Sequence, residues 1–210
     1  MKRNRDILQY WNEAHETQDL DRLTGNTLAT HLEGLGLDPL FSFRHKDVLC
    51  IGVGNGEWIR ELWTKGSRVR AVDISGVALA RMSEFVWTEY LPHELPLLPS
   101  NCFQLVMSFW VSPHMGDEDL VDQISKVLPS LKPMGLFALH YNSPKYGREE
   151  TSCSRPSPIR MGAGDLLRSK ETMARLIEEA GGRPIRWGTV WDVPVHSLEM
   201  NYVWIRRKKS

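Results

Sequence analysis

Three glycines within five positions constrain the fold of this chain more than any other feature. Gly52, Gly54 and Gly56 lie within and directly after the short apolar run "DVLCIGV" (47–53). Glycine in a structured segment costs roughly 0.5–1 kcal/mol relative to alanine, so the backbone must turn where other residues cannot, or a ligand must lie against it. A short continuous apolar run is typical of a strand buried on both faces. The segment therefore predicts a buried strand followed by a tight loop.

Strand-like and helix-like segments alternate along the rest of the chain. Apolar runs predict strands at 68–75, 102–111 and 136–142, with a short one within 84–90. Apolar residues at helical spacing predict helices over 57–66, 76–85, 117–131 and 170–180. The last two runs, 183–194 and 198–207, leave no room for a helix between them and predict an antiparallel hairpin. We expect an α/β fold: a Rossmann-like, doubly wound, seven-stranded and mostly parallel sheet with an antiparallel C-terminal hairpin strand.

The domain organisation follows from where this alternation begins. Residues 1–210 form one predicted domain, in which 46–210 make the Rossmann-like core. Residues 1–45, where Leu, Tyr and Trp are interleaved with charge and positions 1–31 read as helical, predict an N-terminal helical cap or lid. Residues 143–166 are rich in Pro, Ser, Gly and charge, and long irregular loops of this kind are often functional. We expect this segment to be a substrate-side loop.

Composition gives no reason to propose a nucleic-acid or membrane partner. Lys plus Arg and Asp plus Glu both number 26, so the formal net charge is zero. No apolar run approaches the ~18 residues that span a bilayer. The three cysteines show neither a disulfide-framework pattern nor a zinc-ligand spacing. The expected compartment is the cytoplasm, and the sequence leaves open whether the protein is a monomer or a homodimer.

A carboxylate after the second predicted strand points to a nucleoside ligand. The dinucleotide fingerprint requires glycine at position 57, where this chain has Glu57, whose charge would repel a pyrophosphate. Asp73 stands 21 residues after Gly52, a separation that suits hydrogen bonds to ribose hydroxyls. Alone, the glycines could form a plain tight turn and Asp73 a cap or surface residue. Together and in this order they indicate a nucleoside without a pyrophosphate.

Four motifs in order resemble those of the class I S-adenosylmethionine-dependent methyltransferases. They are "VLCIGVGNG", "VRAVDIS", "ELPLLPSNCFQLVMSFWVSPHM" and "LPSLKPMGLFALHY". The resemblance runs from about residue 46 to the C-terminus, and the closing hairpin strand is a hallmark of the family. The sequence departs from the family pattern at Cys50 and Gln104, where acidic residues are usual.

The resemblance implies S-adenosylmethionine as the cofactor, with S-adenosylhomocysteine as the product. The glycines would lie along its methionine and sugar, Asp73 would take the ribose hydroxyls, and Ile74 would lie against the adenine. Residues at the end of the fourth strand would border the sulfonium. The implied cofactor-binding set is Ile51, Gly52, Gly54, Asn55, Gly56, Asp73, Ile74, Glu89, Tyr90, Ser108, Phe109 and Trp110.

Methyl transfer to an oxygen usually needs a proton acceptor, and histidine is the default at neutral pH. His114 follows the fourth predicted strand and His140 lies near the end of the fifth, so both are catalytic candidates, with a hydrogen-bonded structural role as the alternative for each. The candidate substrate-binding residues are Tyr10, Trp11, His15, Tyr141, Arg148 and Arg160. We find no convincing metal site, because Asp117, Glu118 and Asp119 suit the start of a helix.

The expected function is transfer of a methyl group from S-adenosylmethionine to a polar small molecule, at an oxygen of an anionic or sugar-like metabolite. Two alternatives stay open. A methyltransferase-like protein could bind the nucleoside or a partner without catalysis. Cys50 and Gln104 favour this alternative, because they depart from the family pattern. A NAD-dependent oxidoreductase is disfavoured by Glu57 and by the terminal hairpin.

Overall fold

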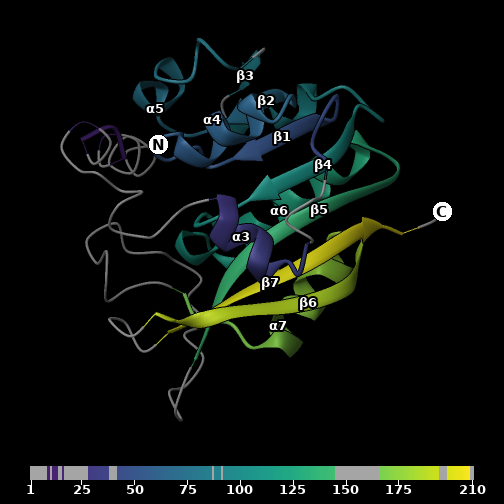
Figure 1. Ribbon diagram of the computed structural model, residues 1–210. Helices are drawn as coiled ribbons and strands as arrows, with labels where there is room; N and C mark the ends of the chain where they lie inside the picture. Colours follow the sequence, from purple (N-terminus) through teal and green to yellow (C-terminus); the bar gives the residue numbers. More distant parts are fainter. Residues whose placement is uncertain are drawn as a thin grey trace.

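The computed structural model describes residues 9, 11–13, 16, 28–37, 42–86, 88–90, 92–144, 166–193 and 198–208. Within these ranges the chain forms one seven-stranded sheet in the order β3-β2-β1-β4-β5-β7-β6 (Figure 1). The strands are β1 (Asp47–Ile51), β2 (Arg68–Val72), β3 (Thr88–Tyr90), β4 (Phe103–Ser108), β5 (Leu131–Pro144), β6 (Gly182–Val193) and β7 (Leu198–Arg207). The helices are α3 (Leu28–Gly34), α4 (Glu57–Thr64), α5 (Gly76–Ala80), α6 (Asp117–Val127) and α7 (Lys170–Glu179), with short 3-10 turns η1 (Pro92–Leu97), η2 (Ser112–His114) and η3 (Leu128–Ser130).

The strand directions place the loop after β1 at the switch in strand order. Strands β1 to β5 are mutually parallel, and β7 runs antiparallel to both β5 and β6. The chain winds outward from β1 to β3 on one side, then crosses back to β4 on the other. In open sheets of this kind, ligands bind at the carboxyl ends of the strands beside that switch. The Rossmann-like α/β class and the terminal antiparallel strand are therefore confirmed.

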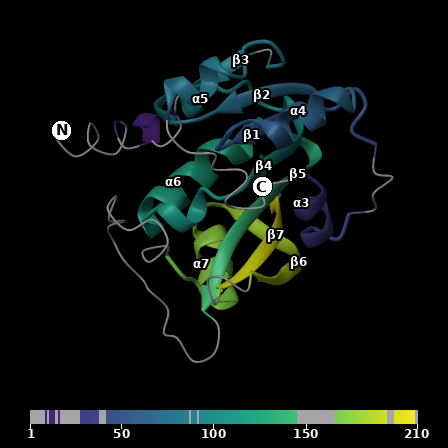
Figure 2. The ribbon, with the colours of Figure 1, turned by 60° about the vertical axis from the view of Figure 1, so that its left-hand side comes forward.

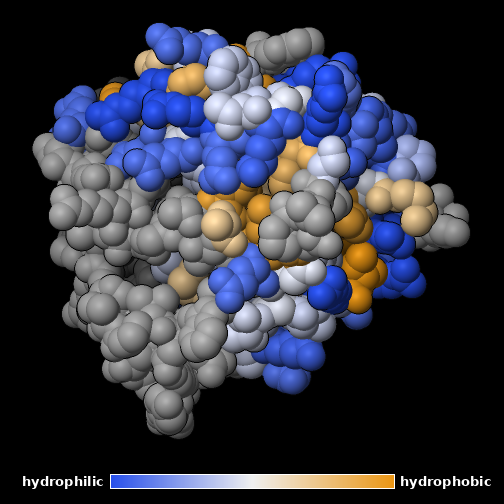
Figure 3. All heavy atoms as spheres, in the orientation of Figure 1, coloured by the Kyte–Doolittle hydropathy of each residue, from blue (hydrophilic) through white to orange (hydrophobic). Residues whose placement is uncertain are grey.

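Two apolar layers cover the two faces of the sheet. One contains the buried residues of α3, α4 and α5, and the other contains those of α6 and α7. Figure 2 shows α3 on one side of the sheet and α6 and α7 on the other. Helix α4 has this two-sided character, because Trp58, Ile59 and Leu62 are buried while hydrophilic side chains cover much of the outer surface above it (Figure 3). Both faces of the sheet are thus occupied, and the ligand site is left to the strand ends.

Two predicted helices are shorter than expected. The segment 117–131 was expected to be helical throughout, but α6 ends at Val127, and Leu131 already opens β5. Pro129 explains this, because it has no N–H to donate and its ring obstructs the preceding turn. Helix α5 ends at Ala80 and is followed by turns instead of continuing to 85.

Strand β5 contains a local break in its regular pairing around Pro133 and Gly135. Met134 has a positive φ of 67°, and the pairing with β4 shifts register between Phe103 and Leu105. A Cβ at Gly135 would stand 2.9 Å from the carbonyl oxygen of Phe103, so only glycine fits this approach. The break is an irregularity within a strand.

Candidate active site

The glycine loop adopts backbone angles that favour glycine. Gly52, Gly54 and Gly56 have φ of 75°, 58° and 86°. A Cβ at Gly52 would lie 2.2 Å from Val111 Cγ2, and one at Gly56 would lie 2.1 Å from Met82 Cε. Both reasons anticipated for glycine, a left-handed turn and close approach, are present. The loop leaves bare backbone at the carboxyl end of β1.

Asp73 organises this loop from the neighbouring strand. Its carboxylate is buried, and it accepts hydrogen bonds of 2.8 Å from the N–H groups of Val53 and Ser75, one on each oxygen. One side chain thus ties the turn after β1 to the turn after β2. The sequence reasoning gave Asp73 a ligand-binding role and did not foresee this second, architectural one.

Buried polar atoms gather where β4 ends, next to His140 of β5. Ser108 Oγ, Trp110 Nε1 and His140 Nε2 are buried and have no hydrogen-bond partner among the described residues. Ser108 is the last residue of β4 and pairs with Ile51 of β1. Unsatisfied buried polar atoms are costly and call for an explanation. A ligand with polar atoms, seated between the glycine loop and the end of β4, supplies one.

Phe109 turns away from this edge into the core. Its ring stacks on the ring of His31 with centroids 3.8 Å apart, and Trp58 and Tyr202 surround the pair. His31 Nδ1 lies 2.9 Å from Tyr202 Oη. Phe109 was expected to border a sulfonium, but the structure places its ring in this aromatic cluster. His31, which the sequence gave no role, joins α3 to β7.

Trp110 and His140 hold the chain after β4 in a strained turn. Trp110 has a positive φ of 58°, and its backbone N–H donates to His140 Nδ1 at 3.2 Å. Ser112 Oγ donates to the carbonyl oxygen of His140 at 2.6 Å. Because Nδ1 accepts, neutral His140 carries its proton on Nε2. Burial, and secondarily the charge of His114, lowers the pKa of His140 to about 3. At neutral pH it is a hydrogen-bond donor and a poor proton acceptor.

Arg168 fixes the following turn, and no feature of the sequence signalled it. The side chain is 2% exposed, and its Nε donates to Asp117 Oδ1 at 2.9 Å. Its other nitrogens donate to the backbone carbonyls of Ser112 and Met115. The guanidinium thus holds both sides of η2, the turn that carries His114, through these three hydrogen bonds.

The N-terminal residues that the structure describes reach both ends of the site. The rings of Trp11 and His114 meet edge to face, with centroids 5.1 Å apart. Ser75 Oγ donates to Asn12 Oδ1 at 2.7 Å, beside Asp73. The N-terminal helical cap or lid over 1–45 remains a prediction.

Several predicted site residues cannot be compared with the structure. Tyr10, His15, Arg148 and Arg160 lie outside the described residues, as do the side chains of Glu89 and Tyr90 and most of the loop 143–166. Among the others, Asn55 and Ile74 are half-buried near the glycine loop and Ile51 is buried. Tyr141 lies on the α7 face of the sheet, edge-on to Trp187 at 6.0 Å between ring centroids.

An acid-sensitive stability follows from the two buried histidines. Burial lowers the pKa of His31 as well as that of His140, so both stay neutral in the fold. The unfolded chain takes up protons below its ordinary histidine pKa of about 6.5. Stability is therefore full above that pH and falls as the pH drops toward about 3, the folded pKa of His140. Each histidine contributes a slope of up to about 1.4 kcal/mol per pH unit. Urea unfolding at pH 7, 6 and 5 measures it.

The matched variants for this prediction are His140→Gln and His45→Asn. The glutamine cannot titrate, so the pH slope should decrease by about 1 kcal/mol per unit. His45 has a positive φ, which asparagine tolerates, and it lies in an exposed turn. Its replacement is the control for removing an imidazole from the surface. An unaltered slope in His140→Gln would contradict a neutral buried His140.

Known proteins resemble this chain in the same region. The profile of a family described as "Methyltransferase domain" matches residues 48–135. The curated Alpha N-terminal protein methyltransferase 1 of Caenorhabditis elegans is 27% identical over 154 residues, which cover 64% of this chain and 64% of that protein. The chain thus spans somewhat less than two thirds of the length of this curated relative.

Two solved structures share the fold at low sequence identity. A SAM-dependent methyltransferase from Leishmania major matches with a TM-score of 0.69 and 16% identity, over 97% of this chain and 82% of that one. The 1,6-didemethyltoxoflavin-N1-methyltransferase of Burkholderia thailandensis, solved with S-adenosylhomocysteine, matches with a TM-score of 0.63 and 16% identity, over 87% and 76%.

The strand order, the glycine loop, Asp73 and the matched profile lead to one class. They point to the class I S-adenosylmethionine-dependent methyltransferases: residues 48–135 are similar to the methyltransferase-domain family, and the chain has the Rossmann-like methyltransferase fold. The residues present fit that cofactor, because Asp73 and the unsatisfied Ser108 Oγ flank the bare loop. Among the described residues, no helix is long and apolar enough to cross a membrane.

Proposed function

We propose that this protein transfers a methyl group from S-adenosylmethionine to a polar small-molecule acceptor, at an oxygen of an anionic or sugar-like metabolite. The observation that carries the methyl-transfer proposal is the left-handed glycine loop tied to Asp73 at the switch in strand order. The cofactor supplies an activated methyl group on a sulfonium, so the protein's contribution is position and desolvation. The buried polar atoms of Ser108, Trp110 and His140, at and beyond the end of β4, support a role in binding and orienting the acceptor.

His114 is the proposed proton acceptor, and His140 the positioning residue beside it. His114 is only half-buried, and Arg168 holds its turn against β5. The low pKa of His140 disfavours it as a base. Its Nε2–H and the indole N–H of Trp110 are buried donors, with ring centroids 4.6 Å apart, that could orient lone pairs of an acceptor.

Replacing His114 with alanine is expected to lower kcat by about 10²–10⁴-fold, the usual contribution of a general base. The dissociation constant for S-adenosylhomocysteine should stay within about twofold, because the ring lies beyond the glycine loop. Turnover and calorimetric titration measure the two quantities. His45→Asn serves as the control and should change neither. Full turnover in His114→Ala would make this histidine structural.

An α-amino group is a second candidate acceptor, because the curated Caenorhabditis elegans relative is named as an N-terminal protein methyltransferase. A base near the sulfonium would serve an ammonium group equally well, since the amine must lose a proton before it attacks. Peptides with free and with acetylated N-termini distinguish this candidate from hydroxyl acceptors.

The test begins with calorimetric titration of S-adenosylhomocysteine, with NAD as the control. Binding of the first and silence from the second is the expected result. Radiolabelled S-adenosylmethionine is then offered with hydroxyl-bearing anionic compounds and sugars, and with the two peptides. Methylation of a hydroxyl compound supports the proposal, and methylation of the free peptide alone replaces it with the second candidate. Cofactor binding without turnover on any acceptor favours a non-catalytic binding protein.

A further inference from the structure

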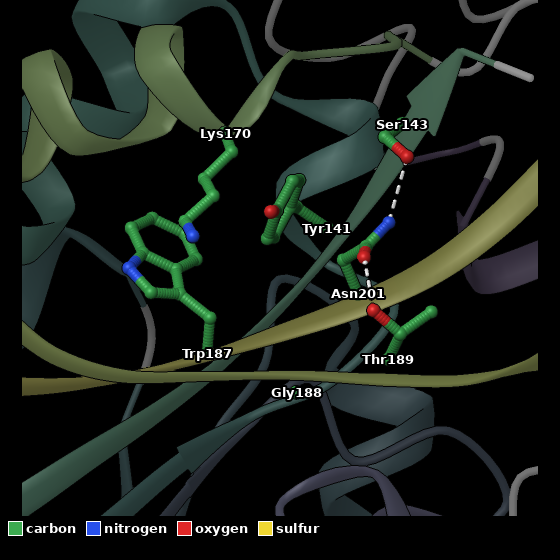
Figure 4. A pocket seen from close by; sticks show the side chains of 7 residues that line it. All are labelled: Tyr141, Ser143, Lys170, Trp187, Gly188, Thr189 and Asn201. Atoms are coloured by element: carbon green, nitrogen blue, oxygen red, sulfur yellow. Dashed lines mark hydrogen bonds between the residues drawn. The ribbon is translucent and has the colours of Figure 1, made fainter.

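A cavity of about 340 Å³ lies on the α7 face of the sheet, away from the glycine loop. Figure 4 shows it between the end of β5, strands β6 and β7, and the start of α7. It is lined by Tyr141, Ser143, Lys170, Trp187, Gly188, Thr189 and Asn201. Its volume falls within the range of small-molecule sites, about 300–1,000 Å³. Of its lining residues, Tyr141 was a candidate for binding the methyl acceptor from the sequence, but the proposed roles of His114, His140 and Trp110 do not involve this cavity.

Strand geometry separates this cavity from the cofactor site. Successive side chains of a strand point to opposite faces. His140 therefore faces Tyr202 on the α3 side, while Tyr141 packs on Trp187 on the α7 side. The cavity also lies beyond β5 in the sheet, whereas the glycine loop follows β1 on the other side of β4. The two sites can be filled at the same time.

The charge of the lining selects an anion. Lys170 is the one charged side chain among the described residues that line the cavity. Its Nζ lies 5.3 Å from the centre of the Trp187 ring, and Figure 4 shows the ammonium group beside that ring. Because none of these described lining residues is a carboxylate, an anionic ligand gains from the ammonium group and a cation is repelled by it.

The side chains that line the cavity favour a ligand with a planar ring and a polar group at one end. Trp187 and Tyr141 form one wall, with ring planes 80° apart. Across from them, Asn201 Nδ2 donates to Ser143 Oγ at 2.7 Å and Thr189 Oγ1 donates to Asn201 Oδ1 at 2.9 Å. Because the Thr189 hydroxyl donates its proton to Asn201, its oxygen can take part in a further hydrogen bond only as an acceptor. They suit a hydroxyl donor.

We propose that this cavity is a second ligand site, which binds a small aromatic carboxylate carrying a hydroxyl at the end opposite the carboxylate. The carboxylate meets Lys170, the ring lies against Trp187 and Tyr141, and the hydroxyl donates to Thr189. The site is independent of the cofactor and does not depend on the acceptor of the methyl group.

Calorimetry on the full chain with 4-hydroxybenzoate tests this proposal, and 4-hydroxybenzamide is the matched uncharged probe. The carboxylate should bind at least about tenfold more tightly than the amide. Lys170→Met should remove this difference, while Lys126→Met, on the exposed surface of α6, should preserve it. Thr189→Val should lower the affinity for 4-hydroxybenzoate by about three- to tenfold and leave the affinity for benzoate unchanged. Saturating S-adenosylhomocysteine should not alter any of these affinities.

Each contrary result overturns a defined part of the proposal. Equal binding of the acid and the amide, or no effect of Lys170→Met, rejects the anion site. Competition with S-adenosylhomocysteine means that the probe occupies the cofactor crevice instead. No binding of 4-hydroxybenzoate by the wild-type chain, whose fold is checked by circular dichroism, rejects the ligand class. Failure of cofactor binding or of turnover leaves this test intact, because it reads a different cavity.

Discussion

Replacing Asp73 with asparagine is expected to weaken the binding of S-adenosylhomocysteine by about 100-fold or more. The carboxylate receives the N–H groups of Val53 and Ser75 on its two oxygens. An amide group would set an NH₂ against one of these donors. Hydrogen bonds to a charged group contribute roughly 1.5–3 kcal/mol each. The loop would lose its anchor, and the ribose would lose its proposed acceptor. Calorimetric titration measures the affinity, and urea unfolding measures the accompanying loss of stability.

Asp47→Asn is the matched control for this substitution. Asp47 lies at the opposite end of β1, where it forms ion pairs of 2.8 and 2.9 Å with Arg68 and Lys132. Its exchange removes the same charge and should change stability by about 1 kcal/mol or less. Cofactor affinity should remain that of the wild type. If both variants bind S-adenosylhomocysteine equally well, Asp73 neither shapes the loop nor contacts the ribose.

Replacing Arg168 with methionine is expected to lower the free energy of unfolding by about 3–5 kcal/mol. The substitution leaves the carbonyls of Ser112 and Met115 and the carboxylate of Asp117 without the donors that Arg168 supplies. The turn carrying His114 should loosen, so the variant that still folds should lose turnover more than cofactor affinity. Urea unfolding, turnover and calorimetry measure the three effects.

Arg175→Met provides the comparison, because Arg175 also pairs with Asp117. Its side chain is 61% exposed, and its nitrogen lies 3.9 Å from Asp117 Oδ2. Exposed pairs contribute about 0–1 kcal/mol, so stability and turnover should change little. Similar losses in the two variants would show that the ion pair with Asp117, and not the burial of Arg168 against two carbonyls, determines the effect.

Local sequence was enough to predict the tight glycine turn after β1 and the carboxylate of Asp73 after β2. Gly52 and Gly56 stand where φ is positive and where a Cβ would collide with a neighbour, and such positions are visible as glycines following an apolar run. Asp73 was found from its separation along the chain, because one strand, one helix and a second strand have a nearly fixed length in this fold.

The acceptor side was less predictable, because its contacts join residues far apart in the sequence. Arg168 binds Ser112, 56 positions away, and His31 bonds Tyr202, 171 positions away. Nothing in the neighbours of either residue signals a buried partner. The role of His140 changed for the same reason, since its low pKa comes from burial by surrounding elements.

The periodicity of apolar residues determined the alternation of strands and helices, the terminal hairpin and hence the class of fold, since each depends on residues close together in the chain. Tertiary structure alone decided which polar side chains are buried and what they meet. Burial sets the cost of an unpaired charge or donor, and burial is a property of the packed molecule. For that reason the glycine turn and the position of Asp73 could be predicted from sequence. The hydrogen bonds of Arg168 around η2 and the cavity beside α7 could be found only from the fold.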